Sequence, residues 1–343
     1  MNQTVLALPM IGAFTLLYTY LGGLKAVVAM DVVQLAIYLA GAGVSMAIIL
    51  NHLPSGWSDV VRYASTGDKF QIFNPQWGGS IMEFLSSPYT LVGGLLGGTF
   101  LTMASHGTDQ LLVQRLLGCR TKWESQRALM LDAAFIVLQF AFFLVLGLCL
   151  FAFYDGIPFK DLGLSSSDEI FPKFIKESLP TGVAGLVIAG VLASAMGTLS
   201  SSISSLASST FLDLFKLSRH GQALDDQRQL RWSRIFTLVW GIVLIGGAIL
   251  FTDTKNPVVE LGLRIASFTY GGLLGTFFLG LFFRRATQRD AFIGFIAGIV
   301  AMTLVITLTS IDFTWHTLIG CVVTIVLGNL SSVSRTLMSQ EKR

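Results

Sequence analysis

The sequence predicts an all-α protein, a polytopic bundle of about nine transmembrane helices in a single domain. Of its 343 residues, 53% are hydrophobic and 13% are charged, whereas soluble proteins carry about 25% charged residues. The apolar residues form runs of about 20, the helical length that crosses the hydrocarbon core of a bilayer. This composition excludes an ordinary soluble enzyme. The formal net charge of +3 is too small to indicate a nucleic-acid partner.

Nine stretches are long and apolar enough to span the membrane. They lie near residues 4–21, 26–50, 89–114, 127–153, 180–215, 230–252, 258–283, 290–310 and 315–334. The first is interpreted as a membrane helix, because it lacks the basic leader and A-x-A site of a secretory signal. The connections at 52–88 and 154–179 are rich in Pro, Gly and Ser, so they are expected to be surface loops with a short helix in each.

Basic residues accumulate in alternate connections. Clusters at 115–127, 216–234 and 284–289 fall on the side that the C-terminus occupies, while the other connections carry fewer. The positive-inside rule therefore places the N-terminus of this chain outside and its C-terminus in the cytoplasm. The short loops suggest the inner membrane of a bacterial cell.

The second span contains a carboxylate, Asp31, near its inner third. A carboxylate on an isolated helix at membrane depth costs about 2.5–3.5 kcal/mol to insert, so Asp31 is expected to face protein, water or a cation. The alternative is a hydrated aspartate near the helix end that accepts a hydrogen bond from Lys25. The sequence leaves both open.

The third span combines glycines with a polar run. Four glycines precede the polar stretch 102–110. Glycines and polar groups at membrane depth favour a broken helix, whose free N–H and C=O groups can hold a substrate. His106 alone is more typical of a packing residue than of a ligand or base. Asp109 and Gln110 lie just before Arg115, and the sequence does not distinguish a structural pairing there from a functional role.

The fifth span holds a run dominated by hydroxyl residues at 194–210. At 3.6 residues per turn, one face carries Ser194, Thr198, Ser201 and Ser205, and beside it run Gly197, Ser200, Ser204 and Ser208. Such small residues allow close helix packing, with each hydroxyl bonded to the carbonyl one turn earlier. Alternatively, the hydroxyls and freed carbonyls are hard oxygen ligands for a small dehydrated cation. Na⁺ is then favoured over Ca²⁺ or Mg²⁺, because a single carboxylate is near.

Three passages carry a family resemblance. They are 18–34 (YTYLGGLKAVVAMDVVQ), 108–115 (TDQLLVQR) and the stretch 195–202 that continues to 213–216 (DLFK). In letters, order and spacing they resemble the sodium/solute symporter family, which includes transporters of glucose, proline, pantothenate, sialic acid and iodide. The resemblance covers nearly the whole chain and looks N-terminally truncated.

The resemblance implies an inverted-repeat symporter fold of five plus five helices. On that pattern the spans resemble core helices 4 to 10 followed by two peripheral helices, with core helices 1 to 3 absent. Residues 1–50 would be the remainder of the first repeat, 89–283 the second repeat, and 284–343 the peripheral helices and a cytoplasmic tail.

The resemblance also implies two sodium sites. The main site would take oxygens from Ser194, Gly197 and Thr198, although the family usually has a hydroxyl where this chain has Gly197. A further site, found in some members, would join Asp31 to the hydroxyls of Ser200 and Ser201.

The implied substrate residues lie mainly on the broken helix. They are Ser105, His106, Thr108, Asp109, Gln110 and, on the next span, Gln139. The aromatic residues and the later lysine of sugar-binding members are not found, so a sugar is not the favoured solute.

The function expected from these features is sodium-coupled symport of a small polar organic solute by alternating access. The partners would be sodium, the solute and lipid, with Na⁺ as coupling ion and no other cofactor, since Cys119, Cys149 and Cys321 lack metal-ligand spacing. One alternative is a transport-inactive sensor or assembly subunit that shares the fold. Another is an intramembrane enzyme using His106 and Asp109 as acid and base, which leaves the serine run unexplained.

Overall fold

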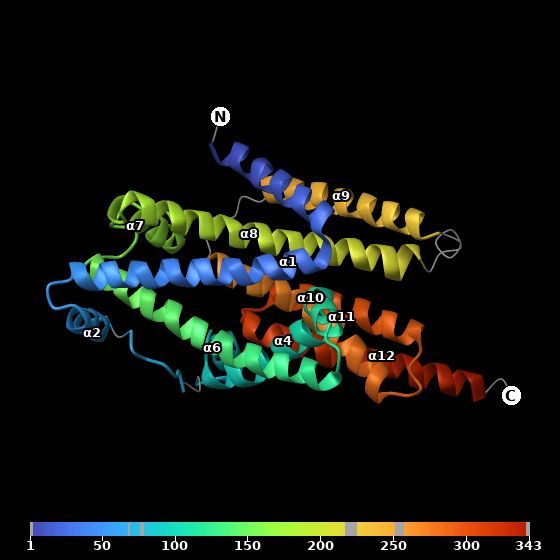
Figure 1. The fold of residues 1–343 in the computed structure, drawn as a ribbon. Helices are drawn as coiled ribbons and strands as arrows, with labels where there is room; N and C mark the ends of the chain where they lie inside the picture. The colour runs from blue at the N-terminus through green and yellow to red at the C-terminus, as the bar shows by residue number, and fades with distance from the viewer. Residues whose placement is uncertain (1–2, 68, 76–78, 217–224, 251–256, 341–343) are drawn as a thin grey trace. The chain divides into compact units, whose positions relative to one another are not determined.

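The computed structural model describes the chain apart from residues 1–2, 68, 76–78, 217–224, 251–256 and 341–343, and every regular element in that part is helical (Figure 1). The long helices are α1 (Gln3–His52), α4 (Leu91–Gly107), α6 (Lys122–Phe153), α8 (Thr181–Ser209), α9 (Asp226–Leu250), α10 (Val258–Phe282), α11 (Gln288–Leu308) and α12 (His316–Gln340). The short ones are α2 (Trp57–Thr66), α3 (Ile81–Ser86), α5 (Gln110–Leu117), η1 (Ser167–Glu169), α7 (Ile170–Ser178), η2 (Thr210–Phe215) and η3 (Phe313–Trp315). The all-α prediction is confirmed.

Seven helices within the described residues are long and apolar enough to cross a membrane, where about nine were expected. The third expected span is interrupted, because α4 ends at Gly107 and α5 begins at Gln110, and neither piece is long enough alone. The first two expected spans form one continuous helix, α1. Only its second half meets the criterion, since several side chains of its first half lie outside the described part.

Local capping explains where several helices begin. The hydroxyl of Thr90 accepts a hydrogen bond from the N–H of Gly93 at 3.1 Å, and Thr121 does the same for the first turn of α6. Such side chains satisfy backbone donors that have no partner inside the helix. Pro180 and Pro257, which have no N–H to satisfy, directly precede α8 and α10. These helix starts are therefore specified by the local sequence.

The chain divides into two compact units, each made of two segments. One consists of Met1–Phe70 with Leu116–Lys255, and the other of Gln71–Arg115 with Asn256–Arg343. We call them unit 1 and unit 2 and describe each by itself. Each of the two long loops was expected to hold one short helix and contains two short helical elements, α2 and α3 in the first and η1 and α7 in the second.

Unit 1 is built around α1, which Figure 1 shows as two straight stretches that meet at a sharp angle. The first stretch packs on α9, where a Cβ built on Gly241 would lie 2.5 Å from Leu16. The second packs along α8, where a Cβ on Gly190 would lie 2.7 Å from Ile37. Glycines thus let the helices approach closely at both contacts.

Unit 2 is built from α4, α10, α11 and α12, which also meet through glycines. A Cβ on Gly271 of α10 would lie 2.8 Å from the Cα of Gly320 of α12, so these two backbones are in direct contact. On α11, the fully buried Asp290 accepts hydrogen bonds from Ser331 and Arg335 of α12, both at 2.8 Å. A buried carboxylate requires such partners.

Candidate functional site

The crossing of α1 and α8 in unit 1 brings a carboxylate to the serine-rich helix. A Cβ built on Gly197 of α8 would lie 2.9 Å from Oδ1 of Asp31 and would overlap Oε1 of Gln34, both on α1. Gln34 is 5% exposed and Gly197 is buried. Two side-chain oxygens of α1 therefore converge on the same small volume beside α8.

The hydroxyls of the serine run nearest this crossing are buried. Ser200 is 0% exposed, Ser201 3% and Ser205 5%. Ser201 lies one turn after Gly197 and Ser205 one turn further, so these residues share a face of α8. The face that turns away from solvent is thus the one that also carries Gly197.

One of these hydroxyls is tied to the first stretch of α1. The Thr19 hydroxyl donates to the carbonyl of Thr15 at 2.6 Å and lies 2.6 Å from the Ser200 hydroxyl. A hydroxyl has one proton to donate, so Ser200 is the donor in the second bond. The oxygen of Ser200 keeps its lone pairs, which is the state that a cation ligand needs.

Thr198 lies off the buried face, whereas Ser194 is half-buried. Thr198 is exposed, and its hydroxyl donates to the carbonyl of Ser194 at 3.1 Å. Ser202 in turn donates to the carbonyl of Thr198 at 3.0 Å. Hydrogen bonds from hydroxyls to the backbone of the same helix agree with the packing interpretation. In these bonds the hydroxyls act as donors, so lone pairs of their oxygens are still available to a cation.

The ligand chemistry available at this crossing is a carboxylate, an amide oxygen and hydroxyls. Within the described residues, no group of three or more His, Cys, Asp or Glu side chains is placed to hold a metal ion. Hard oxygen donors with one negative charge suit an alkali ion better than a transition metal.

The polar run of the third span forms a helix break in unit 2, as expected. The N–H and the hydroxyl of Thr108 both donate to the carbonyl of Ala104, at 2.9 and 2.7 Å, which closes the end of α4. Asp109 then accepts from the N–H of Leu111 at 2.9 Å, which opens α5. Its other carboxylate oxygen accepts a hydrogen bond from the Tyr270 hydroxyl of α10.

The other substrate candidates on this helix lie next to the break. The hydroxyl of Ser105 and Nδ1 of His106 are 2.9 Å apart, and each also lies 3.1 Å from the carbonyl of Thr102. Gln110 is the first residue of α5 and is half-buried. The structure therefore groups Ser105, His106, Thr108, Asp109 and Gln110 within one short stretch of unit 2.

Gln139 belongs to unit 1 and has its hydrogen-bond partner there. It lies on α6 and pairs with Tyr38 of α1. The expected substrate residues are consequently divided between the two units.

A largely apolar crevice of about 550 Å³ lies beside the break in unit 2. It is lined by Gly107, Thr108, Val113, Leu273, Thr276, Phe277, Gln288, Ala291, Phe292 and Phe295. Thr108 is the one expected site residue on its wall. Side chains of α10 and α11 supply most of the rest, and no motif of the sequence indicated them.

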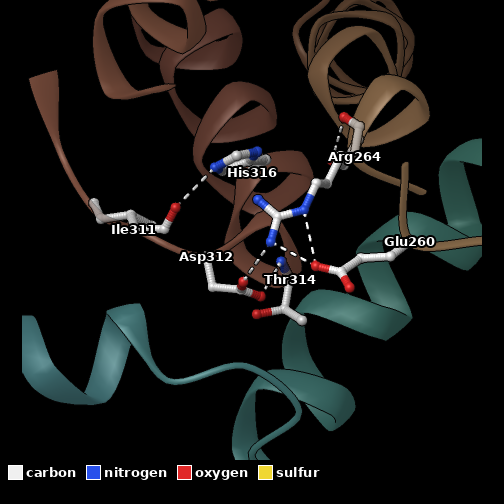
Figure 2. Close-up of polar contacts among 7 residues, drawn as sticks. Glu260, Arg264, Ile311, Asp312, Thr314 and His316 are labelled. Atoms are coloured by element: carbon white, nitrogen blue, oxygen red, sulfur yellow. Dashed lines mark hydrogen bonds and ion pairs between the residues drawn. The ribbon is translucent and has the colours of Figure 1, made fainter. Parts of the chain in front are cut away.

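A second polar cluster in unit 2 joins α10 to the start of α12 (Figure 2). Arg264 lies 2.7 Å from Oε1 of Glu260 and 3.6 Å from Oδ2 of Asp312, whose side chain is 6% exposed. Asp312 also accepts from the N–H of Thr314 at 3.2 Å, and His316 lies 3.1 Å from the carbonyl of Ile311. These bonds satisfy the Asp312 carboxylate and Nε2 of His316, whereas Oγ1 of Thr314 and Nδ1 of His316 are buried without a hydrogen-bond partner.

Sequence reasoning missed three residues of these clusters, Thr19, Gln34 and Tyr270. Gln34 follows Asp31 by one helical turn, so a search for polar residues at that spacing could have found it. Thr19 and Tyr270 act across long sequence separations, and no local pattern marks them.

A polytopic helix bundle with a broken helix, and with a carboxylate at a helix crossing inside the apolar spans, defines a membrane protein of the secondary-transporter class. Comparison with known families makes this specific. The chain belongs to the sodium:solute symporter family, whose model matches residues 2–298. The resemblance found in the sequence is thereby confirmed.

Individual relatives are transporters. The sodium/sialic acid symporter NanT of Aliivibrio fischeri is 26% identical over 328 residues, which cover 94% of this chain and 63% of NanT. Human sodium-coupled monocarboxylate transporter 1 is 28% identical over 294 residues, covering 84% of this chain and 46% of the transporter. This chain thus spans less than two thirds of these relatives' lengths.

A solved structure shares the fold. It is described as the substrate-bound outward-open state of a Na⁺-coupled sialic acid symporter that reveals a novel Na⁺ site. It matches with a TM-score of 0.80 at 25% identity and covers 96% of this chain and 66% of that chain.

Proposed function

We propose that this protein carries out sodium-coupled secondary active symport of a small polar organic solute by alternating access. The observation that carries the proposal is the crossing of α1 and α8. There Asp31 of α1 lies beside Gly197 of α8. Ser200 and Ser201, which are buried, lie on the same side of α8 as Gly197. A carboxylate in a membrane helix is a functional feature by default. Membership of a family of sodium:solute symporters supports the same conclusion.

Sodium is assigned two sites in this proposal. One ion is held by Asp31, Ser200 and Ser201, and a second by oxygens of Ser194, Gly197 and Thr198. Binding stabilises an outward-open state that already exists in the conformational equilibrium. Each inward charge gains about 2.3 kcal/mol per 100 mV, so two ions sustain a solute ratio above about a hundredfold.

The solute is assigned to the helix break. Ser105, His106, Thr108, Asp109 and Gln110 supply polar groups there, and free backbone groups at a broken helix add donors and acceptors. Gln139 of α6 is proposed as a further polar contact for a solute within unit 1. Relatives named for sialic acid and monocarboxylates make acids the first solutes to test. No enzymatic step is part of the proposal.

The membrane setting follows from the charge pattern. We assign the protein to the inner membrane of a bacterial cell, with this chain's N-terminus outside and its C-terminus in the cytoplasm. Residues 1–50 are assigned to the first inverted repeat, 89–283 to the second and 284–343 to peripheral helices and tail. Labelling of single cysteines at the two ends by an impermeant reagent checks the orientation.

The test is uptake into proteoliposomes that contain the protein. Labelled sialic acid and short monocarboxylates are supplied with an inward Na⁺ gradient or with choline. We expect uptake in Na⁺, and a loss of tenfold or more in Asp31→Asn and Thr198→Ala, because removing a ligand to a desolvated charge costs about 1.5–3 kcal/mol.

Thr303→Ala is the matched control. Thr303 is an exposed threonine of α11 whose hydroxyl also donates one turn back, to Ile299. It should transport like the wild type. Uptake that proceeds equally in choline, or that is unchanged in Asp31→Asn, contradicts the proposal.

A further inference from the structure

We propose that the side-chain oxygen of Gln34 is an additional ligand of the sodium ion held by Asp31, Ser200 and Ser201, and that Gly197 is the residue that makes room for it. The inference rests on the proposed function, since it presupposes sodium at the crossing of α1 and α8. It adds a ligand that neither the sequence motif nor the hydroxyl run indicates.

The first argument is position. A side chain at residue 197 would overlap Oε1 of Gln34, and its Cβ would lie 2.9 Å from Oδ1 of Asp31. The amide oxygen therefore occupies the volume in which any other residue at 197 would place its side chain. Asp31 and Gln34 are three residues apart on α1, so both side chains leave the same face of the helix.

The second argument is burial. Gln34 is 5% exposed, although glutamine is mostly found at the surface of proteins. Burial of an amide without compensation costs about 1–3 kcal/mol. An amide oxygen and a carboxylate oxygen directed at one volume cannot hydrogen-bond to each other, because both are acceptors. A cation in that volume can be coordinated by both oxygens.

The third argument is the pattern of α8. Gly197 stands one turn before Ser201 and two turns before Ser205, and both of these serines are buried. Gly197 is the member of this row that brings no side-chain oxygen. The glutamine of the facing helix brings one to the same place, so the row of oxygens is continuous when both helices are considered.

The competing role for Gln34 is packing alone. Its oxygen could simply contact the Cα–H groups of Gly197, as oxygen atoms often do at close helix crossings. A packing role and a ligand role predict different responses to sodium, which makes them separable. A packing residue contributes equally to thermal stability in NaCl and in choline chloride. A ligand contributes to the stabilisation only when Na⁺ is bound.

The experiment measures sodium binding to the purified full chain in lipid nanodiscs. Thermal stability is followed as NaCl replaces choline chloride at constant ionic strength, and the Na⁺ concentration of half-maximal stabilisation is read. In Gln34→Leu the oxygen is gone, and in Gly197→Ala it is displaced by the new Cβ. Both should raise the half-maximal concentration by about tenfold, the effect of losing one ligand to a charge.

Two variants restore the oxygen. Gly197→Ser displaces Gln34 but supplies a hydroxyl, and Gln34→Ala with Gly197→Ser supplies the hydroxyl without crowding. Both should bind Na⁺ within about threefold of the wild type, a difference near 0.7 kcal/mol. Rescue by the double variant also shows that the loss in the single variants is not misfolding.

Ser45→Ala is the control for a buried polar group of α1 away from the crossing, because Ser45 bonds to its own helix at Gly41. It should leave the half-maximal concentration unchanged. Two results overturn the inference and separate it from the proposed function. If Asp31→Asn loses sodium binding while Gln34→Leu and Gly197→Ala retain it, Gln34 is a packing residue only. If the wild type shows no response to Na⁺, both proposals fail together.

Discussion

The hydroxyl of Tyr270 bonds the broken helix of unit 2 to α10. Asp109 uses one carboxylate oxygen to accept from Leu111 and the other to accept from Tyr270. The first bond starts α5, and the second fixes the break against α10. Because hydrogen bonds to charged groups are stronger than neutral ones, this pair contributes more than an ordinary contact.

We predict that Tyr270→Phe lowers the free energy of unfolding by about 1.5–3 kcal/mol, the value of a hydrogen bond to a charged group. The ring stays and only the hydroxyl is lost. Denaturation in mixed micelles measures the difference.

Tyr89→Phe provides the comparison, since it makes the same change on an exposed tyrosine of unit 2. It should alter stability by less than about 0.5 kcal/mol. Equal losses in the two variants would contradict the role given to the bond with Asp109.

Two adjacent glycines of α4 differ completely in what they face. A Cβ on Gly97 would overlap the carbonyl oxygen of Thr314 in η3, whereas nothing lies within 4 Å of a Cβ on Gly98. Thr314 presents backbone there, which cannot turn aside as a flexible side chain can. At this point the close approach of α4 to η3 therefore depends on Gly97 and not on Gly98.

We predict that Gly97→Ala destabilises the protein by about 1–3 kcal/mol, as overpacking in a filled core does. Gly98→Ala should instead be neutral or gain up to about 1 kcal/mol from the better helix propensity of alanine. Parallel denaturation curves test the pair. A loss at residue 98 as large as that at residue 97 would contradict the packing seen at η3.

The sequence predicted the break in the third span but not the packing of individual residues around it. It indicated that the third span breaks, because glycines and polar groups stood together there, and the break lies between Gly107 and Gln110. It could not distinguish Gly97 from Gly98, since that depends on η3, which lies more than 200 residues further along the chain. The spacing of Gln34 from Asp31 is visible in the sequence, but its position against Gly197 depends on the facing helix.

At the scale of the whole molecule, composition and periodicity were enough for the fold class. Apolar runs and their spacing predicted the helices, and the family resemblance predicted the fold that the solved symporter structure shares. The polar contacts that set each helix against its neighbours were not predictable. Arg264 with Asp312 and Asp290 with Arg335 join residues more than 40 positions apart, and nothing local selects those partners.

Transport by the whole molecule should respond to membrane voltage. If two Na⁺ accompany a solute with one negative charge, each cycle carries one net charge inward. An interior potential of −100 mV then raises the accumulated solute ratio by about fiftyfold, from 2.3 kcal/mol per charge.

Proteoliposomes with valinomycin and a potassium gradient impose that potential, and equal potassium on both sides serves as the control. An accumulation ratio that ignores the potential for such a solute would indicate one sodium ion per cycle, and the second site would then be wrong.

Helix α12 is bonded to its neighbours at both of its ends. Arg264 of α10 reaches Asp312 just before it, and Arg335 near its other end reaches Asp290 of α11. Between these ion pairs, the backbone contact at Gly271 and Gly320 leaves no space for one helix to slide past the other. Any rearrangement in unit 2 is therefore expected to carry α10, α11 and α12 along together.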